Sequence, residues 1–164
     1  MRILIPILLS LLPAAHAAEK HPWASFKPGS YTKMRSTTVA GPSKTVTEMT
    51  QTLISVDANN AVVETETKTM GQTMKNRMNI PLKAAAAAAP QGKAVTVVNE
   101  TIPVAGKALA CKCVETESSA NGMKTLARAC TSEAVPGGAV RVTSKSTGAM
   151  KMDTVLEVVE FAAK

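Results

Sequence analysis

Beyond residue 30, side chains of opposite character alternate along the chain, and turn-forming residues recur at intervals of roughly ten to fifteen positions. Between residues 61 and 70, for example, Glu64 and Glu66 would share one face of an extended strand while Val63 and Thr65 share the other. A period of two with turns at this spacing is typical of antiparallel sheets. The pattern therefore predicts a mainly β domain.

Turn residues divide this alternating region into about nine strands. We expect a single antiparallel meander that curls into a half-barrel, barrel or sandwich, because twist accumulates across a wide sheet and open edges favour self-association. A short helix is expected near Pro22–Phe26. The Val135-Pro136-Gly137-Gly138 segment predicts a type II turn. The expected strands are 30–39, 44–56, 61–70, one starting after Gly71, 94–104, 107–118, 123–131, 139–146 and 149–161.

The first 17 residues have the layout of a secretory signal peptide. A basic start at Arg2 precedes an apolar run, and Ala15-His16-Ala17 supplies the small residues of a cleavage site. The run is about half of the ~20 residues that a membrane span requires. We therefore expect residues 1–17 to be removed, a single domain over 18–164, no later transmembrane segment, and a periplasmic or secreted protein.

Residues 81–93 interrupt the strand pattern. Six alanines, Ala84–Ala89, are closed by Pro90, and a helix this short is marginal in isolation. We interpret residues 81–93 as a linker or flap that separates the first four strands from the remaining ones.

The three cysteines favour one cross-strand disulfide in an oxidising compartment. If Asn121-Gly122 forms a two-residue hairpin turn, Cys113 lies opposite Cys130 and Glu115 lies opposite Arg128, an opposite-charge pair. A four-residue turn would instead pair Cys111 with Cys130. We favour the disulfide between Cys113 and Cys130, and either pairing leaves one thiol over.

Composition excludes several function classes. The net charge of +7 is spread along the chain, and only 2% of residues are aromatic, so neither the basic face nor the stacking side chains of a nucleic-acid binder are evident. His21 is the one histidine after the predicted leader, and the acidic residues are scattered. We therefore predict no enzymatic activity and assign no catalytic residue, cofactor or metal ligand.

The candidate inner faces of the sheet are rich in methionine, valine, leucine and threonine. We predict that this surface binds an apolar or amphiphilic ligand such as a lipid, next to the flap. Two alternatives remain open: a structural envelope protein without a ligand, and a copper-binding protein that uses Cys and Met sulfurs, which suit Cu(I). The predicted ligand-binding residues are Met74, Met78, Ile80, Met150, Met152 and Leu156.

The segment His21–Tyr31 contains a Trp-x-x-Phe-x-x-Gly-Ser motif, and the Val-Pro-Gly-Gly turn follows near the end of the chain. With these motifs the chain resembles a group of secreted bacterial β-rich proteins, which are distantly similar to the periplasmic lipoprotein carriers. That resemblance implies a curved sheet that shelters an acyl chain. Its motifs concern turns and packing, and they imply no catalytic residue.

Overall fold

The computed structural model describes residues 21–83, 93–120, 122–148 and 151–164. The described chain is mainly β, as predicted, with nine antiparallel strands and one short 3₁₀ helix, η1 (Pro22–Ser25). The strands are β1 (Tyr31–Ala40), β2 (Ser43–Val56), β3 (Asn60–Thr69), β4 (Gln72–Pro81), β5 (Lys93–Val104), β6 (Lys107–Ala120), β7 (Met123–Thr131), β8 (Ala139–Thr147) and β9 (Met152–Ala162).

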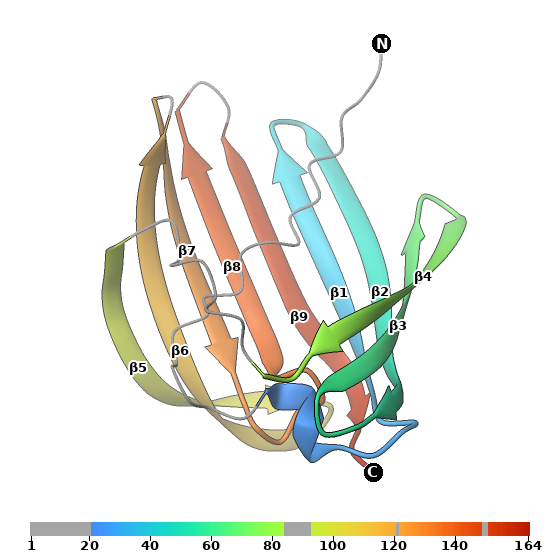
Figure 1. Cartoon of the computed structure of the whole chain (residues 1–164). Coiled ribbons are helices and arrows are strands. Elements are labelled where there is room, and N and C mark those ends of the chain that lie inside the picture. The colour runs from blue at the N-terminus through green and yellow to red at the C-terminus, as the bar shows by residue number, and fades with distance from the viewer. Residues whose placement is uncertain (1–20, 84–92, 121, 149–150) are drawn as a thin grey trace.

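All nine strands belong to one sheet, in the order β4-β3-β2-β1-β9-β8-β7-β6-β5 (Figure 1). Strands that follow one another in the chain are neighbours in the sheet, except β4 and β5, which form its two edges. The first and last strands pair with each other in the middle, where Ser36 lies opposite Leu156. The predicted meander is confirmed, and the sheet remains open at the junction that contains the predicted linker.

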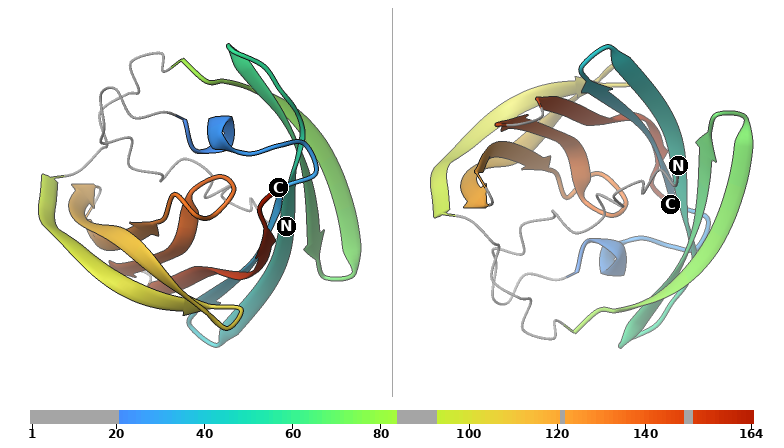
Figure 2. Two further views of the ribbon diagram at one scale, coloured as in Figure 1. Left: turned by 90° about the horizontal axis from the view of Figure 1, so that it is seen from below. Right: turned by 90° about the horizontal axis from the view of Figure 1, so that it is seen from above.

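The sheet is strongly curled, and η1 lies inside the curl (Figure 2). Pro22 occupies the first turn of η1, where a missing N–H costs little, and the backbone N–H of Trp23 donates to His21 Nδ1 at 3.3 Å. Burial lowers the pKa of His21. We call the sheet face that carries Trp23 the inner face.

The turn at Val135–Gly138 confirms the predicted geometry. The N–H of Gly138 donates to the carbonyl oxygen of Val135 at 2.8 Å, and Gly137 has a φ of 80°, as the third position of a type II turn requires. An added Cβ on Gly137 would lie 2.9 Å from Trp23 Cζ2. The turn therefore packs directly against η1, and this close approach requires glycine.

The core consists of two hydrophobic clusters. One joins Trp23 to Leu53, Ala61 and Val63 of β2 and β3. The other includes Met34 and Val158, together with buried side chains of the β5–β6 hairpin such as Leu109. That hairpin bends toward β9, which β5 contacts without being its sheet neighbour. The cluster with Met34 therefore packs side chains from both halves of the curled sheet together.

Candidate functional site

The strand registers place the predicted ligand-binding residues on one face of the sheet. Met78 lies opposite Val63, which packs with Trp23, so Met78 belongs to the inner face. Because side chains on a strand alternate between faces, Met74 and Ile80 lie on the same side. On β9 the ladder through β1 assigns Met152 and Leu156 to this face as well. Met150 lies outside the described residues.

These five residues are spread across the inner face. Ile80 packs against the Trp23 cluster, and Leu156 packs against the Met34 cluster. Met74 is 67% exposed on the edge strand β4, and three strands separate β4 from β9 in the sheet. The structure therefore places these five residues on one face of the sheet without gathering them into one pocket. Two residues that were not predicted, Met34 on β1 and Met49 on β2, lie opposite each other on the strands between β4 and β9.

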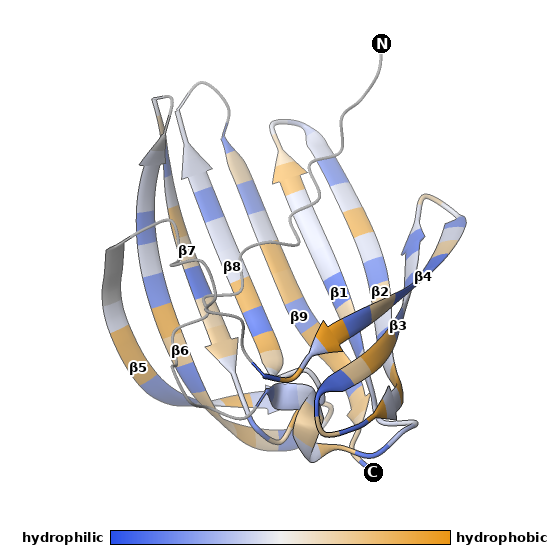
Figure 3. Ribbon diagram, in the orientation of Figure 1, coloured by the Kyte–Doolittle hydropathy of each residue, from blue (hydrophilic) through white to orange (hydrophobic). Residues whose placement is uncertain are grey.

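By strand register the inner face carries little charge, although Lys107 Nζ lies 5.1 Å from the ring centre of Phe161, an inner-face residue of β9. Charged side chains at paired strand positions, such as Lys33, Glu66 and Lys145, project from the opposite, outer face. Among the paired positions whose side chains the structure describes, Lys112 is the one charged residue that the registers assign to the inner face. Hydrophilic and hydrophobic residues form alternating bands along several strands (Figure 3). The inner face is therefore suited to neutral ligand surfaces.

Hydroxyl groups on the inner face are paired with one another across strands. Thr69 Oγ1 donates to Thr47 Oγ1 at 3.1 Å. The hydroxyls of Thr38 and Thr154 lie 3.2 Å apart, and a further pair joins Thr125 to Ser146 at 3.0 Å. A hydroxyl that already has a partner costs less to remove from water than an unpaired one. These pairs make the threonine-rich region more compatible with an apolar ligand.

The outer face carries cross-strand ion pairs instead. Glu66 binds Lys75 at 3.0 Å and Lys68 at 3.4 Å, and both lysines lower the pKa of its carboxyl. Arg77 binds Glu64 at 2.7 Å in the next rung of the same ladder. These pairs are largely exposed, as expected of a surface in contact with water.

A cavity of about 380 Å³ opens on this outer face, over β1, β2, β3 and β9. Its lining includes Lys33 and Lys68 as well as Glu48 and Glu160. The hydroxyl of Tyr31 donates to Glu160, and this hydrogen bond is the main cause of the raised pKa of Tyr31. The cavity is polar and contains none of the predicted ligand-binding residues.

The disulfide joins Cys113 on β6 to Cys130 on β7, as the favoured register predicts. Glu115 lies opposite Arg128 in the same ladder, and their side chains approach to 3.7 Å. The Cα atoms of the two cysteines are 4.0 Å apart, close to the spacing of a non-hydrogen-bonded cross-strand pair. Cys111 is the leftover thiol, and it is buried.

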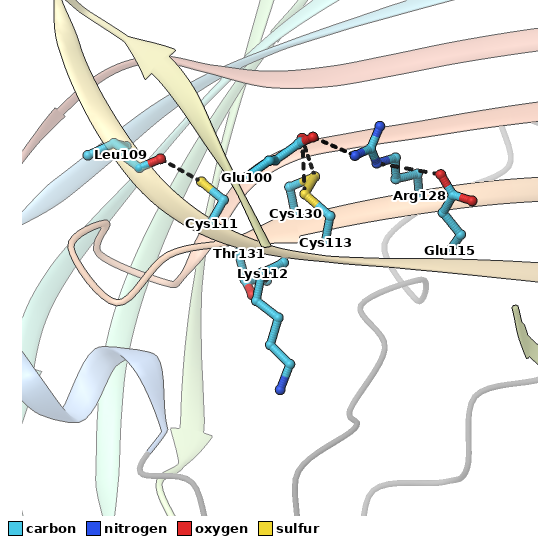
Figure 4. Close-up of a disulfide and its surroundings, with 9 residues drawn as sticks. All are labelled: Glu100, Leu109, Cys111, Lys112, Cys113, Glu115, Arg128, Cys130 and Thr131. Atoms are coloured by element: carbon cyan, nitrogen blue, oxygen red, sulfur yellow. Dashed lines mark hydrogen bonds and ion pairs between the residues drawn. A yellow bond between two sulfur atoms is a disulfide. The ribbon is translucent and has the colours of Figure 1, made fainter. Parts of the chain in front are cut away.

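An acidic side chain from β5 lies against this disulfide (Figure 4). Glu100 Oε1 is 3.2 Å from Cys113 Sγ and 3.6 Å from Cys130 Sγ. The other carboxylate oxygen accepts a hydrogen bond from Arg128 at 2.6 Å. Glu100 was not predicted as part of this site. Its position beside the sulfurs follows from the β5–β6 register, which places it opposite Cys111.

The residues of the copper alternative are not gathered in one ladder. Met74 and Met78 lie on the edge strand β4, whereas Cys111 and Cys113 lie on β6. Six strands separate β4 from β6 in the sheet order, and Cys113 is committed to the disulfide. A shared site for the sulfurs of these methionines and cysteines therefore has no support in the sheet pairing.

Comparison of the chain with protein-family profiles, curated proteins and solved structures yields no match. Within the described ranges, η1 is the sole helix, and nothing helical there has the length and apolarity of a membrane span.

Proposed function

We propose that this protein is an exported, non-enzymatic binding protein whose inner sheet face holds an amphiphilic, lipid-like molecule. The observation that carries the proposal is the segregation of charge: the outer face bears the ion pairs, and Lys112 is the one charged residue assigned to the inner face among the described paired positions. A charged side chain facing an acyl chain would have to lose water without gaining a partner.

The composition of the inner face also fits a flexible apolar ligand. Methionine side chains adapt to irregular shapes, and this face carries Met34 on β1, Met49 on β2, and Met74 and Met78 on β4. The paired hydroxyls of Thr47 and Thr69 border this methionine-rich part. A ligand with an apolar chain and a polar, uncharged portion would match both regions.

The open edge of the sheet supports entry of a long ligand. β4 and β5 are not paired with each other, so the curl is not closed into a barrel. A chain-like molecule could therefore reach the inner face from the side as well as from the ends. Export is supported by the signal-like residues 1–17 and by the disulfide, which oxidising compartments favour.

A matched pair of substitutions on β4 tests the proposal. Met74→Glu places a charge on the inner face at a position that is already 67% exposed, whereas Thr73→Glu places the same charge on the outer face one residue away. We expect Met74→Glu to weaken binding of a fluorescent fatty acid by about tenfold, a change of roughly 1.4 kcal/mol. The control variant should bind as wild type does.

Native mass spectrometry of protein purified from its own host provides the second measurement. A retained lipid mass would support carriage. If the wild-type protein carries no added mass and binds no fatty acid probe, the binding function is wrong and a structural envelope role becomes the better interpretation. Equal weakening by the two β4 variants would also contradict the proposal, because the effect would then be independent of the face.

A further inference from the structure

We propose that the reduced form of this protein binds a divalent zinc-type ion through Cys113, Cys130 and Glu100. The site lies on β5, β6 and β7, and none of its three donor residues is among the predicted ligand-binding residues. The three donor atoms, the two cysteine Sγ atoms and one carboxylate oxygen, all lie within 4.8 Å of one another. Thiolate and carboxylate oxygen are both established zinc ligands.

In the oxidised form, the distances from the Glu100 carboxylate to the two sulfurs are close to those of a tetrahedral site. With Zn–S bonds of ~2.3 Å and Zn–O bonds of ~2.1 Å, a sulfur and an oxygen bound to the same zinc lie about 3.6 Å apart. The observed distances from Glu100 Oε1 to the two sulfurs are 3.2 and 3.6 Å. Two sulfurs joined in a disulfide are not thiolates, so the site can form only when the disulfide is reduced.

Two chemical steps lead to the loaded site. A dithiol reductant transfers two electrons and two protons to the disulfide, giving two thiols, and is itself converted to a disulfide. The metal ion then binds the two sulfurs and Glu100 while both thiol protons pass to solvent. Two thiolates and one carboxylate carry three negative charges, which the ion and the neighbouring Arg128 together balance.

Neighbouring groups support this arrangement. Arg128 donates to the second oxygen of Glu100 at 2.6 Å and lies 3.7 Å from Glu115, so the carboxylate is held in place beside the sulfurs. Such outer contacts orient metal ligands and raise affinity. Cys113 and Cys130 are buried, whereas the Glu100 side chain is 35% exposed, which gives an ion access from solvent. The fourth coordination position remains for water or another small ligand.

The test uses the full chain, reduced without oxygen on an immobilised dithiol resin and then titrated with Co²⁺ as a spectroscopic substitute for zinc. We expect one Co²⁺ per reduced chain, with thiolate-to-cobalt absorption that Zn²⁺ removes. Glu100→Gln should weaken binding by at least about tenfold. Glu117→Gln is the matched control, because Glu117 lies on β6 and pairs with Lys124 away from the sulfurs.

Two further variants complete the test. Cys113→Ser should abolish the absorption even if Glu100→Gln fails to fold, and Cys111→Ala should leave it unchanged. The proposal is overturned if reduced wild type binds no Co²⁺ or loses its β circular dichroism signal. The proposal is also overturned if the oxidised chain binds Co²⁺ as well as the reduced chain does, or if Glu100→Gln binds it as well as Glu117→Gln does. Loss of binding in Cys111→Ala would overturn it as well. None of these results depends on lipid binding.

Discussion

Thr32 on β1 donates a hydrogen bond from its hydroxyl to the carbonyl oxygen of Pro136, at 2.6 Å and across 104 residues of sequence. Both residues are buried. The bond joins the connection between β7 and β8 to β1, which lies on the other side of β9 in the sheet. It therefore connects the turn, the first strand and the Trp23 cluster.

Replacement of Thr32 by valine keeps the shape of the side chain but removes the donor. We expect the free energy of unfolding to fall by about 1–3 kcal/mol, because the carbonyl of Pro136 would be left unsatisfied in a buried position. Urea denaturation followed by circular dichroism measures this change. Thr32→Ser, which keeps the hydroxyl, should lose less, and equal losses in the two variants would contradict a role for the hydrogen bond.

Gly137 and Gly106 have nearly equal φ angles, but only Gly137 lies close to another side chain. Comparing their alanine variants therefore separates the cost of a positive φ from the cost of steric overlap. Gly137→Ala should destabilise the protein by about 2–4 kcal/mol, since the new Cβ would combine a positive φ with an overlap against Trp23. Gly106→Ala, at a φ of 78° with open space around it, should cost only about 1–2 kcal/mol. Denaturation curves of the two variants give the difference directly. A larger loss at Gly106 would show that the turn does not pack on η1.

Removal of the disulfide should destabilise the chain without abolishing the sheet. The two cysteines are 17 residues apart, and closing a loop of this size contributes about 3 kcal/mol in the chain-entropy model. We expect Cys113→Ala with Cys130→Ala to lower the free energy of unfolding by that amount. An intact-mass measurement verifies that wild type is two hydrogens lighter than its reduced form. A double variant as stable as wild type would show that the bond does not constrain the unfolded chain.

The buried thiol of Cys111 predicts a pH dependence. Burial is the main cause of its raised pKa, and the nearby Glu100 carboxylate acts in the same direction. The folded state therefore holds this proton more tightly than the unfolded state does, and the stabilising effect is present at neutral pH. It is lost as the pH rises above the ordinary thiol value of 9.0. Unfolding curves of wild type and Cys111→Ala should converge above that pH, and parallel curves would contradict the prediction.

Much of the fold could be predicted from local sequence. The Asn121-Gly122 dipeptide predicted the β6–β7 register, and the Cys113–Cys130 and Glu115–Arg128 pairings that follow from it are confirmed. Alternation along β4 placed Met74 and Met78 on one face of that strand, and alternation along β9 placed Met152 and Leu156 on one face of that strand. These successes share a cause: hairpin register and side-chain alternation depend on residues close together in the chain.

Other features depend on contacts between distant segments, and local sequence carried no information on them. The pairing of β1 with β9 defines where the sheet opens, yet no turn residue connects these strands. Glu100 reaches the disulfide because two ladders combine: the β5–β6 register places it opposite Cys111, and the β6–β7 register places Cys113 opposite Cys130. The cavity over Tyr31 and Glu160 similarly combines strands from both ends of the chain.

The pairing of β1 with β9 affects the order in which the sheet folds. A chain emerging from the ribosome or through a membrane pore can form the β1–β4 hairpins early, but β1 has no second neighbour until β9 has emerged. Such sequence-distant pairings slow folding, because the entropy cost of closing the loop comes before the stabilising contacts form. The complete sheet should therefore form more slowly than the hairpins on either side of this pairing.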